Sequence, residues 1–187
     1  NLGKRRLMRN TMSIIRDCPD KDVFSWYAVY TSFRSEKLVA NQLRKKNIEV
    51  YLPLVSKTKR YLRKFKTYQV PMIGCYLFVK IKRNQCISVL ETERVVKIIS
   101  ERGQPSIIKE DEINVLKRIE GLEVGIENCG SNLIPGDKVA IRKGNLAGLK
   151  GRLIRQNGKK SFIVELESVG ITLQLCIDTD MLLKTSS

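Results

Sequence analysis

The hydrophobic pattern of this 187-residue chain changes near residue 134, and that change constrains the fold more than any other feature. Before it, runs of strand-like alternation are interspersed with stretches whose apolar residues recur at helical spacing. After it, short β-branched runs are separated by turn signals, of which Asn157-Gly158 is the strongest because a type I′ turn needs positive φ at both positions. We therefore expect two small domains of different class.

The expected boundaries follow the same pattern. Residues 1–22 carry scattered basic charge without a sustained period, which predicts a flexible N-terminal arm. Residues 23–121 form the first domain, and residues 134–187 form the second. The segment 122–133 is rich in glycine and lacks periodicity, which predicts a linker.

The first domain is predicted to be α+β, with the order βαβββαβα. The segment SWYAVYT (25–31) alternates like a strand, and a helix over 35–46 would place Leu38, Val39 and Leu43 on one stripe. Two further helices are expected at 84–91 and 110–120. The result is an antiparallel sheet with helices, of the split βαβ kind. The second domain is predicted to be a small all-β barrel.

Composition excludes several classes of function. The chain has 35 basic and 19 acidic residues and no histidine, so its net charge is +16. Without histidine there is no imidazole for acid-base catalysis or zinc binding, and five cysteines without a C-x-x-C pair indicate neither a disulfide framework nor a metal knuckle. No phosphate-binding loop motif occurs. We expect a protein that is not an enzyme and has no cofactor or metal ion.

The same composition points to location and partner. Unpaired cysteines suit a reducing compartment, and no apolar run approaches the ~20 residues of a membrane helix, so we expect a cytoplasmic protein without a membrane partner. A pI of about 9.8 favours a polyanionic partner, nucleic acid first among them.

The strongest local charge lies in the segment SKTKRYLRKFK. Its cations are interleaved with Tyr61 and Phe65, and could bind phosphates while the rings stack on bases. A solvated hairpin whose lysines discourage edge-to-edge aggregation would show the same sequence pattern. The charge of the whole chain favours the first interpretation. The cations are Lys57, Lys59, Arg60, Arg63, Lys64 and Lys66.

The aromatic residues leave two alternatives open. Tyr76 and Phe78 share one face of their predicted strand, and Tyr30 shares a face with Trp26. Isolated aromatics are usually core residues. A sheet covered by helices on one side could instead leave its aromatic face open for a partner.

Three ordered blocks carry a family resemblance. WYAVYTSFRSEKLVANQLRKKNIEVYLPLV, VPMIGCYLFVKI and PGDKVAIRKGNLAGLKGRLI resemble the NusG/RfaH family of transcription elongation factors, and among these the UpxY-like specialised antiterminators. The resemblance spans about residues 25–184. It implies an N-terminal NGN domain and a C-terminal KOW domain with an SH3-like barrel.

The resemblance implies a factor that binds RNA polymerase through the clamp helices of its largest subunit. Such a factor suppresses pausing and termination at selected operons, and UpxY-like members suggest surface-polysaccharide operons. The alternative function is a ribosome- or RNA-binding KOW-domain protein. By motif position, the polymerase-binding residues would be Tyr30, Ile73, Tyr76, Phe78, Ile113 and Leu116.

The resemblance also implies contacts with nucleic acid, either the non-template DNA strand or nascent RNA. Gln42, Lys45, Lys46 and Arg94 match the positions that touch the non-template strand, and the basic hairpin would lie beside upstream DNA. The KOW residues Gly136, Asp137, Gly144, Gly148 and Gly151 are expected to be structural.

Two departures from the family pattern stand out. The family's Pro-Gly or Pro-Asn pair before the strand tyrosine is Gly74-Cys75 here. In the second domain, the general family member recruits termination factor Rho or a small-subunit ribosomal protein. The aromatic that precedes its loop glycine is Val169 here, before Gly170.

Overall fold

The structure is a computed structural model, and its elements fall into two compact units. One unit comprises Asn1–Pro53 and Ile73–Glu110, and the other comprises Leu54–Met72 and Asp111–Ser187. The first unit does not coincide with the expected first domain, residues 23–121. Residues 54–72 and the residues from Asp111 onward belong to the second unit instead. The structure describes residues 23–62, 64–120, 126–128, 138–141, 146–156, 159–166, 168, 170–175 and 182–184.

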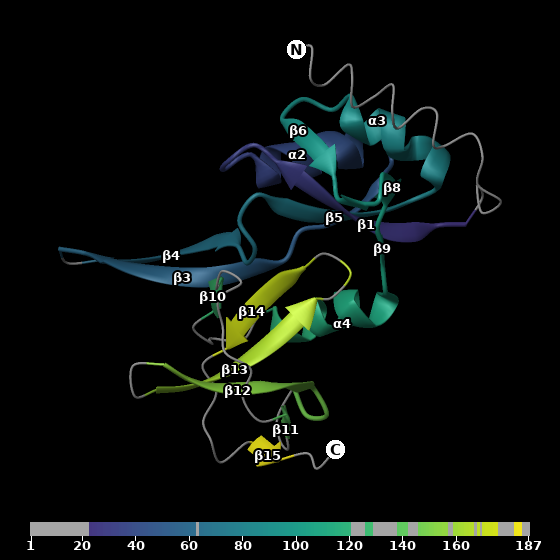
Figure 1. The fold of residues 1–187 in the computed structure, drawn as a ribbon. Coiled ribbons are helices and arrows are strands. Elements are labelled where there is room, and N and C mark those ends of the chain that lie inside the picture. The colour runs from purple at the N-terminus through teal and green to yellow at the C-terminus, as the bar shows by residue number, and fades with distance from the viewer. Residues whose placement is uncertain are drawn as a thin grey trace. The chain divides into compact units, whose positions relative to one another are not determined.

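The first unit is built on an antiparallel sheet with β1 (Ser25–Thr31) at its centre (Figure 1). β1 pairs with β5 (Tyr76–Ile81) on one side and with β6 (Val95–Ile98) and β9 (Ile107–Ile108) on the other. β2 (Glu49–Tyr51) adds to the outer edge of β5. The predicted antiparallel sheet is confirmed.

Residues on both faces of β1 are buried. Trp26 and Ala28 lie on one face and Tyr27 and Val29 on the other, and none is more than 3% exposed. Alternation therefore located the strand, but it did not mark an inner and an outer face, because neighbouring structure covers both sides. A strand buried in this way forms the core of its domain.

Helices occur where the apolar spacing predicted them. α2 spans Glu36–Lys45, a 3-10 turn at Arg83–Gln85 leads into α3 (Cys86–Leu90), and α4 spans Glu110–Ile119. The expected stripe of α2 is wrong at one position. Val39, Ala40 and Leu43 are buried with Glu36, whereas Leu38 is 48% exposed, because it lies about 100° around the helix from Val39.

A long hairpin and a shorter one complete the region before residue 120. β3 (Leu54–Tyr61) and β4 (Lys64–Pro71) pair over their whole length, and Leu62 begins the turn between them. The predicted basic hairpin is therefore confirmed. β7 (Ser100–Glu101) and β8 (Gln104–Pro105) form the shorter one around Arg102 and Gly103, both of which have positive φ.

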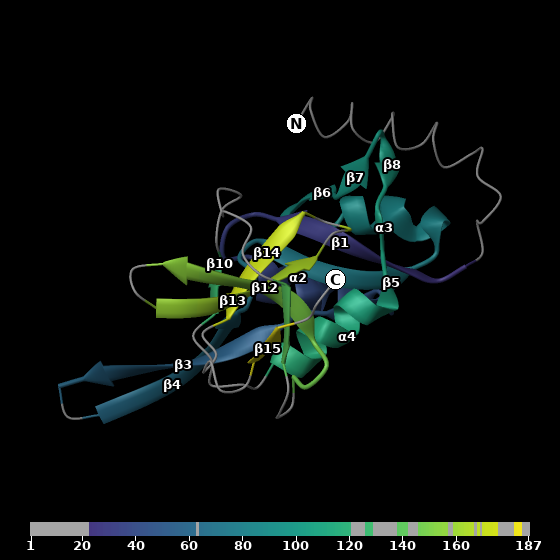
Figure 2. The ribbon, with the colours of Figure 1, turned by 60° about the horizontal axis from the view of Figure 1, so that its bottom comes forward.

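The second unit contains a six-stranded antiparallel sheet (Figure 2). Its order is β10-β14-β13-β12-β11-β15. One strand, β10, lies within the segment that was predicted to be a linker. The strands are β10 (Ile126–Asn128), β11 (Lys138–Ile141), β12 (Lys150–Gln156), β13 (Lys159–Leu166), β14 (Ile171–Leu175) and β15 (Leu182–Lys184).

Other expectations for this unit stay predictions. The all-β character is present, whereas closure of the sheet into a KOW barrel is not established. The N-terminal arm, the Asn157-Gly158 turn, Gly136, Asp137 and Gly144 lie outside the described residues.

Gly151 is the glycine whose lack of a side chain matters most here. A Cβ at this position in β12 would lie 2.2 Å from the Ile163 carbonyl oxygen and 2.5 Å from the Phe162 ring, which is fully buried. Gly148 has φ +83 and open space around it, so its requirement is conformational instead. At Gly151 the requirement is therefore one of packing, and at Gly148 it is one of backbone conformation.

We predict that Gly151→Ala destabilises the C-terminal sheet by about 1–3 kcal/mol, because a methyl group would displace Phe162 or separate β12 from β13. Gly74→Ala is the matched control, since nothing lies within 4 Å of a Cβ there and its φ is ordinary. Urea denaturation would measure both variants. Equal stability of the two would contradict the packing argument.

Candidate functional site

One face of the first sheet carries a cluster of aromatic side chains, which we call the aromatic face. The register sets Tyr30 opposite Tyr76, Ala28 opposite Phe78, and Tyr51 opposite Phe78 from the other side. Directly opposed residues share a face. The two pairs predicted to share a face within their own strands, Trp26 with Tyr30 and Tyr76 with Phe78, thus lie on one common face of the sheet. The cluster consists of Trp26, Tyr30, Tyr51, Tyr76 and Phe78.

These rings contact one another through most of the cluster. Tyr30 and Tyr76 meet edge to face at 5.2 Å, Tyr51 stacks on Phe78 at 6.1 Å, and Trp26 meets Tyr51 at 6.5 Å. Phe78 is fully buried, whereas Tyr30, Tyr51 and Tyr76 are half-buried. The cluster is thus a core that reaches the surface at its tyrosines, and it is not the fully open face that one alternative expected.

Charged groups hold one end of this face. The Trp26 indole N–H donates to Glu110 Oε2 at 2.9 Å, and the Lys80 ammonium lies 3.6 Å from the same oxygen and 5.6 Å from the indole ring centre. Trp26 and Lys80 are opposite each other in the register of β1 and β5. Glu110, at the start of α4, therefore orients the indole.

The other end is fixed by the turn that contains Cys75. The Cys75 N–H donates to Glu36 Oε1 at 2.7 Å, and the Cys75 carbonyl accepts from the Thr31 N–H at 2.8 Å. Cys75 has φ 65, a left-handed conformation that is costly for a residue with a side chain. The departure at Gly74-Cys75 thus keeps Tyr76 in register, because a buried carboxylate stabilises the turn.

Burial, followed by the neighbouring Tyr30 phenol and Cys75 thiol, raises the pKa of Tyr76 above its ordinary value. Tyr76 therefore keeps its hydroxyl proton at neutral pH. Burial likewise raises the pKa of the Cys86 thiol to about 11, so this fully buried cysteine is not a nucleophile at neutral pH.

The remaining polymerase-binding candidates are buried. Ile73, in the turn before β5, has no exposed surface, and neither do Ile113 and Leu116 on α4. α4 is joined to the C-terminal segment: the Ser168 backbone N–H and hydroxyl both donate to the Glu112 carboxylate, and the Arg118 guanidinium donates to the Ala147 carbonyl. The helix therefore has polar partners at both ends of its apolar stripe.

The four residues expected to contact the non-template DNA strand have different environments. Lys45 is exposed, and Lys46 Nζ donates to the Ser88 carbonyl at 2.9 Å and to the Thr92 hydroxyl at 2.8 Å, which ties α2 to the end of α3. Arg94 has φ 69, and its Nε lies 3.5 Å from Glu93 Oε1. Among the described residues, Gln42 Oε1 is buried without a hydrogen-bond partner. Lys46 thus has a structural role that its sequence position did not indicate.

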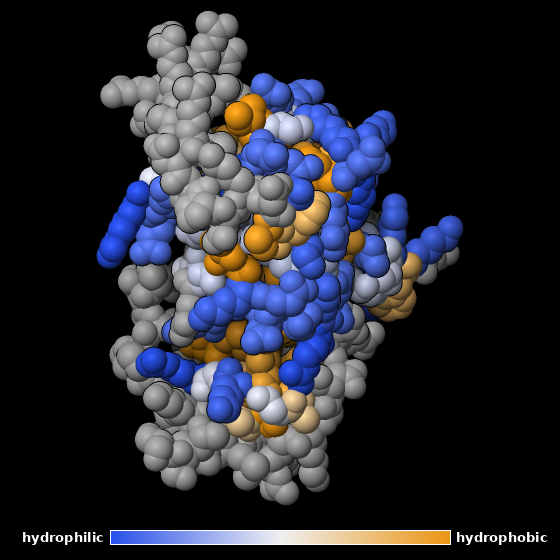
Figure 3. All heavy atoms as spheres, turned by 90° about the vertical axis from the view of Figure 1, so that its right-hand side faces the viewer, coloured by the Kyte–Doolittle hydropathy of each residue, from blue (hydrophilic) through white to orange (hydrophobic). Residues whose placement is uncertain are grey.

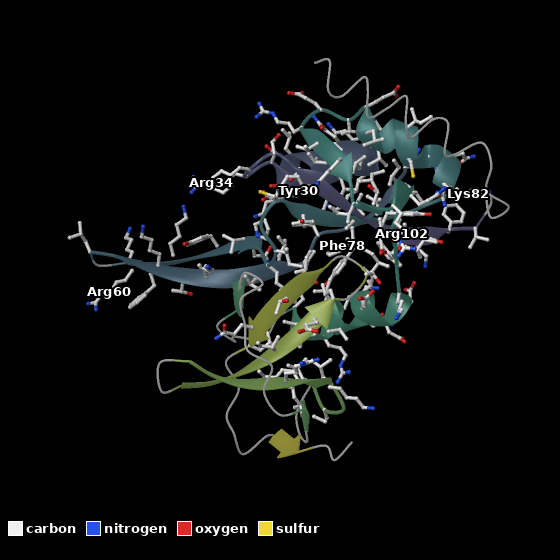
Figure 4. All side chains as sticks on the ribbon, in the orientation of Figure 1. Tyr30, Arg34, Arg60, Phe78, Lys82 and Arg102 are labelled. Atoms are coloured by element: carbon white, nitrogen blue, oxygen red, sulfur yellow. The ribbon has the colours of Figure 1, made fainter. Side chains whose placement is uncertain are left out.

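The basic hairpin is exposed on both faces from Ser56 to Gln69, except where side chains are not described. Lys57, Lys59, Arg60, Lys64 and Lys66 are all exposed. Arg63 and the Tyr61 side chain lie outside the description. Figure 4 shows Arg60 projecting near the far end of β3 and β4.

Sequence reasoning missed an exposed aromatic in the loop after β1. Phe33 is 74% exposed, and the Arg34 guanidinium lies 5.0 Å from its ring centre. Arg34 has φ 57, and the Ser32 N–H donates to the Arg94 carbonyl, so this loop is held against the start of β6. A pattern of one aromatic beside one arginine is too short to be recognised without the fold.

Figure 3 shows one face of the molecule, where polar and charged side chains surround small apolar patches. Across the described ranges, no group of three or more cysteines and carboxylates could hold a metal ion. No helix in those ranges has the length and apolarity needed to cross a membrane.

Comparison with protein families decides the identity of the fold. The family model described as "Transcription termination factor nusG" matches residues 24–117, which is more than half of the chain. The chain belongs to the NusG family. Members of this family are non-enzymatic transcription factors, and the match covers the aromatic face, the hairpin and most of α4.

A solved structure supports this fold, and a second aligns more weakly. The structure described as "Domain interaction in Thermotoga maritima NusG" aligns with a TM-score of 0.58 at 19% identity, covering 87% of this chain and 98% of that one. A chain of the "MjSpt4:Spt5 complex conformation B" aligns with a TM-score of 0.32 at 20% identity, covering 87% and 97%. A sequence comparison with curated proteins gave no match.

We predict that Lys46→Met lowers stability by about 1 kcal/mol, because it removes two hydrogen bonds from a charged donor at a largely exposed site. Lys45→Met is the matched control, since Lys45 is an exposed neighbour on the same helix. Thermal unfolding followed by circular dichroism would measure the difference. If both variants melt like the parent protein, Lys46 does not tie the two helices.

Proposed function

We propose that this NusG-family protein is a specialised elongation and antitermination factor. It binds the clamp helices of the largest subunit of RNA polymerase through its NGN domain and suppresses pausing and termination at selected operons. It acts in the cytoplasm. The observation that carries the proposal is the Tyr30–Tyr76 pair, which brings the aromatic face to the surface within the segment that matches the family.

The two tyrosines suit recognition of an amphipathic helical target. Each ring offers apolar surface together with a hydroxyl, and this combination is favoured at protein interfaces. The hydrogen bonds of Glu36 and Glu110 at the two ends of the face hold it in one conformation, so little side-chain freedom is lost on binding. Phe78 would support the tyrosines from below without touching the partner.

Contact between polymerase and the α4 residues requires a further step. Ile113 and Leu116 are buried on a helix that Glu112 and Arg118 join to Ser168 and Ala147. We propose that α4 presents them to polymerase only after it separates from these C-terminal residues. The free energy of those hydrogen bonds then opposes polymerase binding.

Nucleic acid is the proposed second partner. Lys45 and Arg94 would contact phosphates of the non-template strand, together with Gln42 and the exposed part of Lys46, and the hairpin would contact upstream DNA. The large positive charge and the exposure of the hairpin lysines support this assignment. Assignment to the UpxY-like group and to surface-polysaccharide operons rests on the sequence resemblance.

We expect Tyr76→Ala to weaken binding to RNA polymerase core enzyme at least about tenfold, because aromatic anchors at the centre of an interface contribute about 2 kcal/mol or more. Tyr30→Ala should act in the same direction. Tyr68→Ala is the matched control, since Tyr68 is a 40% exposed tyrosine on β4, outside the aromatic face.

The measurement is surface plasmon resonance with core enzyme free of nucleic acid, so that DNA contacts do not contribute. Phe78 is unsuitable as a test because it is fully buried and its loss would unfold the domain. Unchanged affinity of a folded Tyr76→Ala variant would refute the assignment of the polymerase-binding face.

We expect Glu112→Ala to strengthen polymerase binding, because it removes both hydrogen bonds from Ser168 to α4. Glu165→Ala is the control, as Glu165 is an exposed carboxylate on β13. Surface plasmon resonance with core enzyme measures the affinity of both variants. If Glu112→Ala binds no more tightly than the parent, separation of α4 does not limit binding.

A further inference from the structure

The aromatic face carries a lysine beside an aromatic ring at each of its two ends. Since directly opposed residues share a face, Lys80 of β5 lies beside Trp26, and Lys97 of β6 lies beside Tyr30. The Lys80 ammonium is 5.6 Å from the centre of the indole ring, and the Lys97 ammonium is 5.8 Å from the centre of the Tyr30 ring. Both cations are therefore part of the aromatic face.

The packing of β6 fixes the direction of Lys97. Its neighbour Ile98 pairs with Val29 in the interior and is only 6% exposed. Because successive side chains of a strand point to opposite sides of the sheet, Lys97 points to the side of Tyr30. The position of this cation on the aromatic face is thus determined by the core on the other side of the sheet.

The charge of Lys80 is balanced within the fold. Its ammonium lies 3.6 Å from Glu110 Oε2, and Glu49 lies directly opposite Lys80 in the register of β2 and β5. Two carboxylates therefore accompany the cation at the Trp26 end of the face.

The charge of Lys97 is not balanced in this way. Lys97 is exposed, and within the described part of the chain it forms no ion pair. Glu36, which lies at the same end of the face, is 5% exposed and accepts a hydrogen bond from the Cys75 N–H. The tyrosine end of the aromatic face therefore has an excess of positive charge.

A partner that covers the tyrosines must also cover this charge. Tyr30 and Tyr76 are half-buried rings in contact at 5.2 Å, and the Lys97 ammonium lies over the Tyr30 ring. Removing water from a cation costs several kcal/mol unless an anion pairs with it. A partner with a carboxylate at this point is therefore favoured, whereas one with an apolar or basic side chain there is disfavoured.

We propose that Lys97 pairs with a carboxylate of the helical partner and thereby determines which targets the aromatic face accepts. The partner is an amphipathic helix with an acidic side chain beside the apolar stripe that covers Tyr30 and Tyr76. A protein carboxylate suits the site better than a phosphate of nucleic acid, because the ammonium lies among rings that favour an apolar protein surface. This inference rests on the proposed function, since it specifies the chemistry of the clamp-helix surface that the protein binds.

The test is surface plasmon resonance of the full chain with core enzyme free of nucleic acid. Lys97→Met keeps an aliphatic side chain on Tyr30 and removes the charge, so we expect about fivefold weaker binding at low salt. This loss should disappear at about 1 M salt, where ion pairs are screened. Lys97→Glu should weaken binding about a hundredfold, because it opposes like charges.

Lys150→Met is the matched control, since Lys150 is an exposed lysine on a strand, β12, of the second unit. Its affinity for core enzyme should equal that of the parent. Circular dichroism establishes that each variant is folded.

An exchange of charges identifies the partner group. The carboxylates of the polymerase clamp helices are changed to lysine one at a time, and each altered core enzyme is tested against Lys97→Glu. We expect one of these enzymes to recover most of the lost affinity, because the ion pair is restored with its charges reversed.

Four results would overturn the inference. They are unchanged affinity of both Lys97 variants, a loss in Lys97→Met that salt does not reduce, failure of every altered clamp helix to rescue Lys97→Glu, and a loss that occurs only when the polymerase holds DNA. The second result would mean that Lys97 merely supports the Tyr30 ring, and the fourth would assign Lys97 to a phosphate.

Tyr76→Ala separates this inference from the proposed function. If Tyr76→Ala loses affinity for core enzyme and the Lys97 variants do not, only the inference about Lys97 fails. If the folded Tyr76→Ala variant also binds like the parent, the proposed polymerase-binding face fails with it.

Discussion

Burial of β1 on both faces is the constraint on which the first unit depends. The strand pairs along β5 on one side and with β6 and β9 on the other, so its backbone hydrogen bonds are satisfied while its side chains form two cores. One core contains Tyr27 and Val29. The other is the aromatic face. Because both share one backbone, the position of Tyr30 at the surface is determined by the same register that packs the interior.

Carboxylates join several of the segments that surround the aromatic face and α4. Glu36 accepts from the backbone of the turn before Tyr76, Glu110 orients Trp26, and Glu112 accepts from Ser168. In a chain with net charge +16, each of these acids is used at a point where two segments meet. The described cations of the hairpin remain exposed at the surface.

The hairpin separates two tasks by the parity of its strands. Side chains of successive residues point to opposite faces, so one ribbon presents lysines on one side and neutral hydroxyls on the other. The neutral side stabilises the ribbon through Thr58 and Thr67. On the charged side Lys59 lies opposite Lys66, so the two faces of the ribbon differ in charge although one backbone carries both.

Local patterns alone predicted the helices, the central strand, the basic hairpin and the pairs that share a face within one strand, because apolar periodicity and turn residues are local properties. It did not determine that Leu38 faces solvent, that Phe78, Ile113 and Leu116 are buried, or that Lys46 bonds to Ser88. Those facts depend on what packs against each element. The cations of the hairpin followed the same rule: charge was readable from composition, but only the cross-strand register decided which cations share a face.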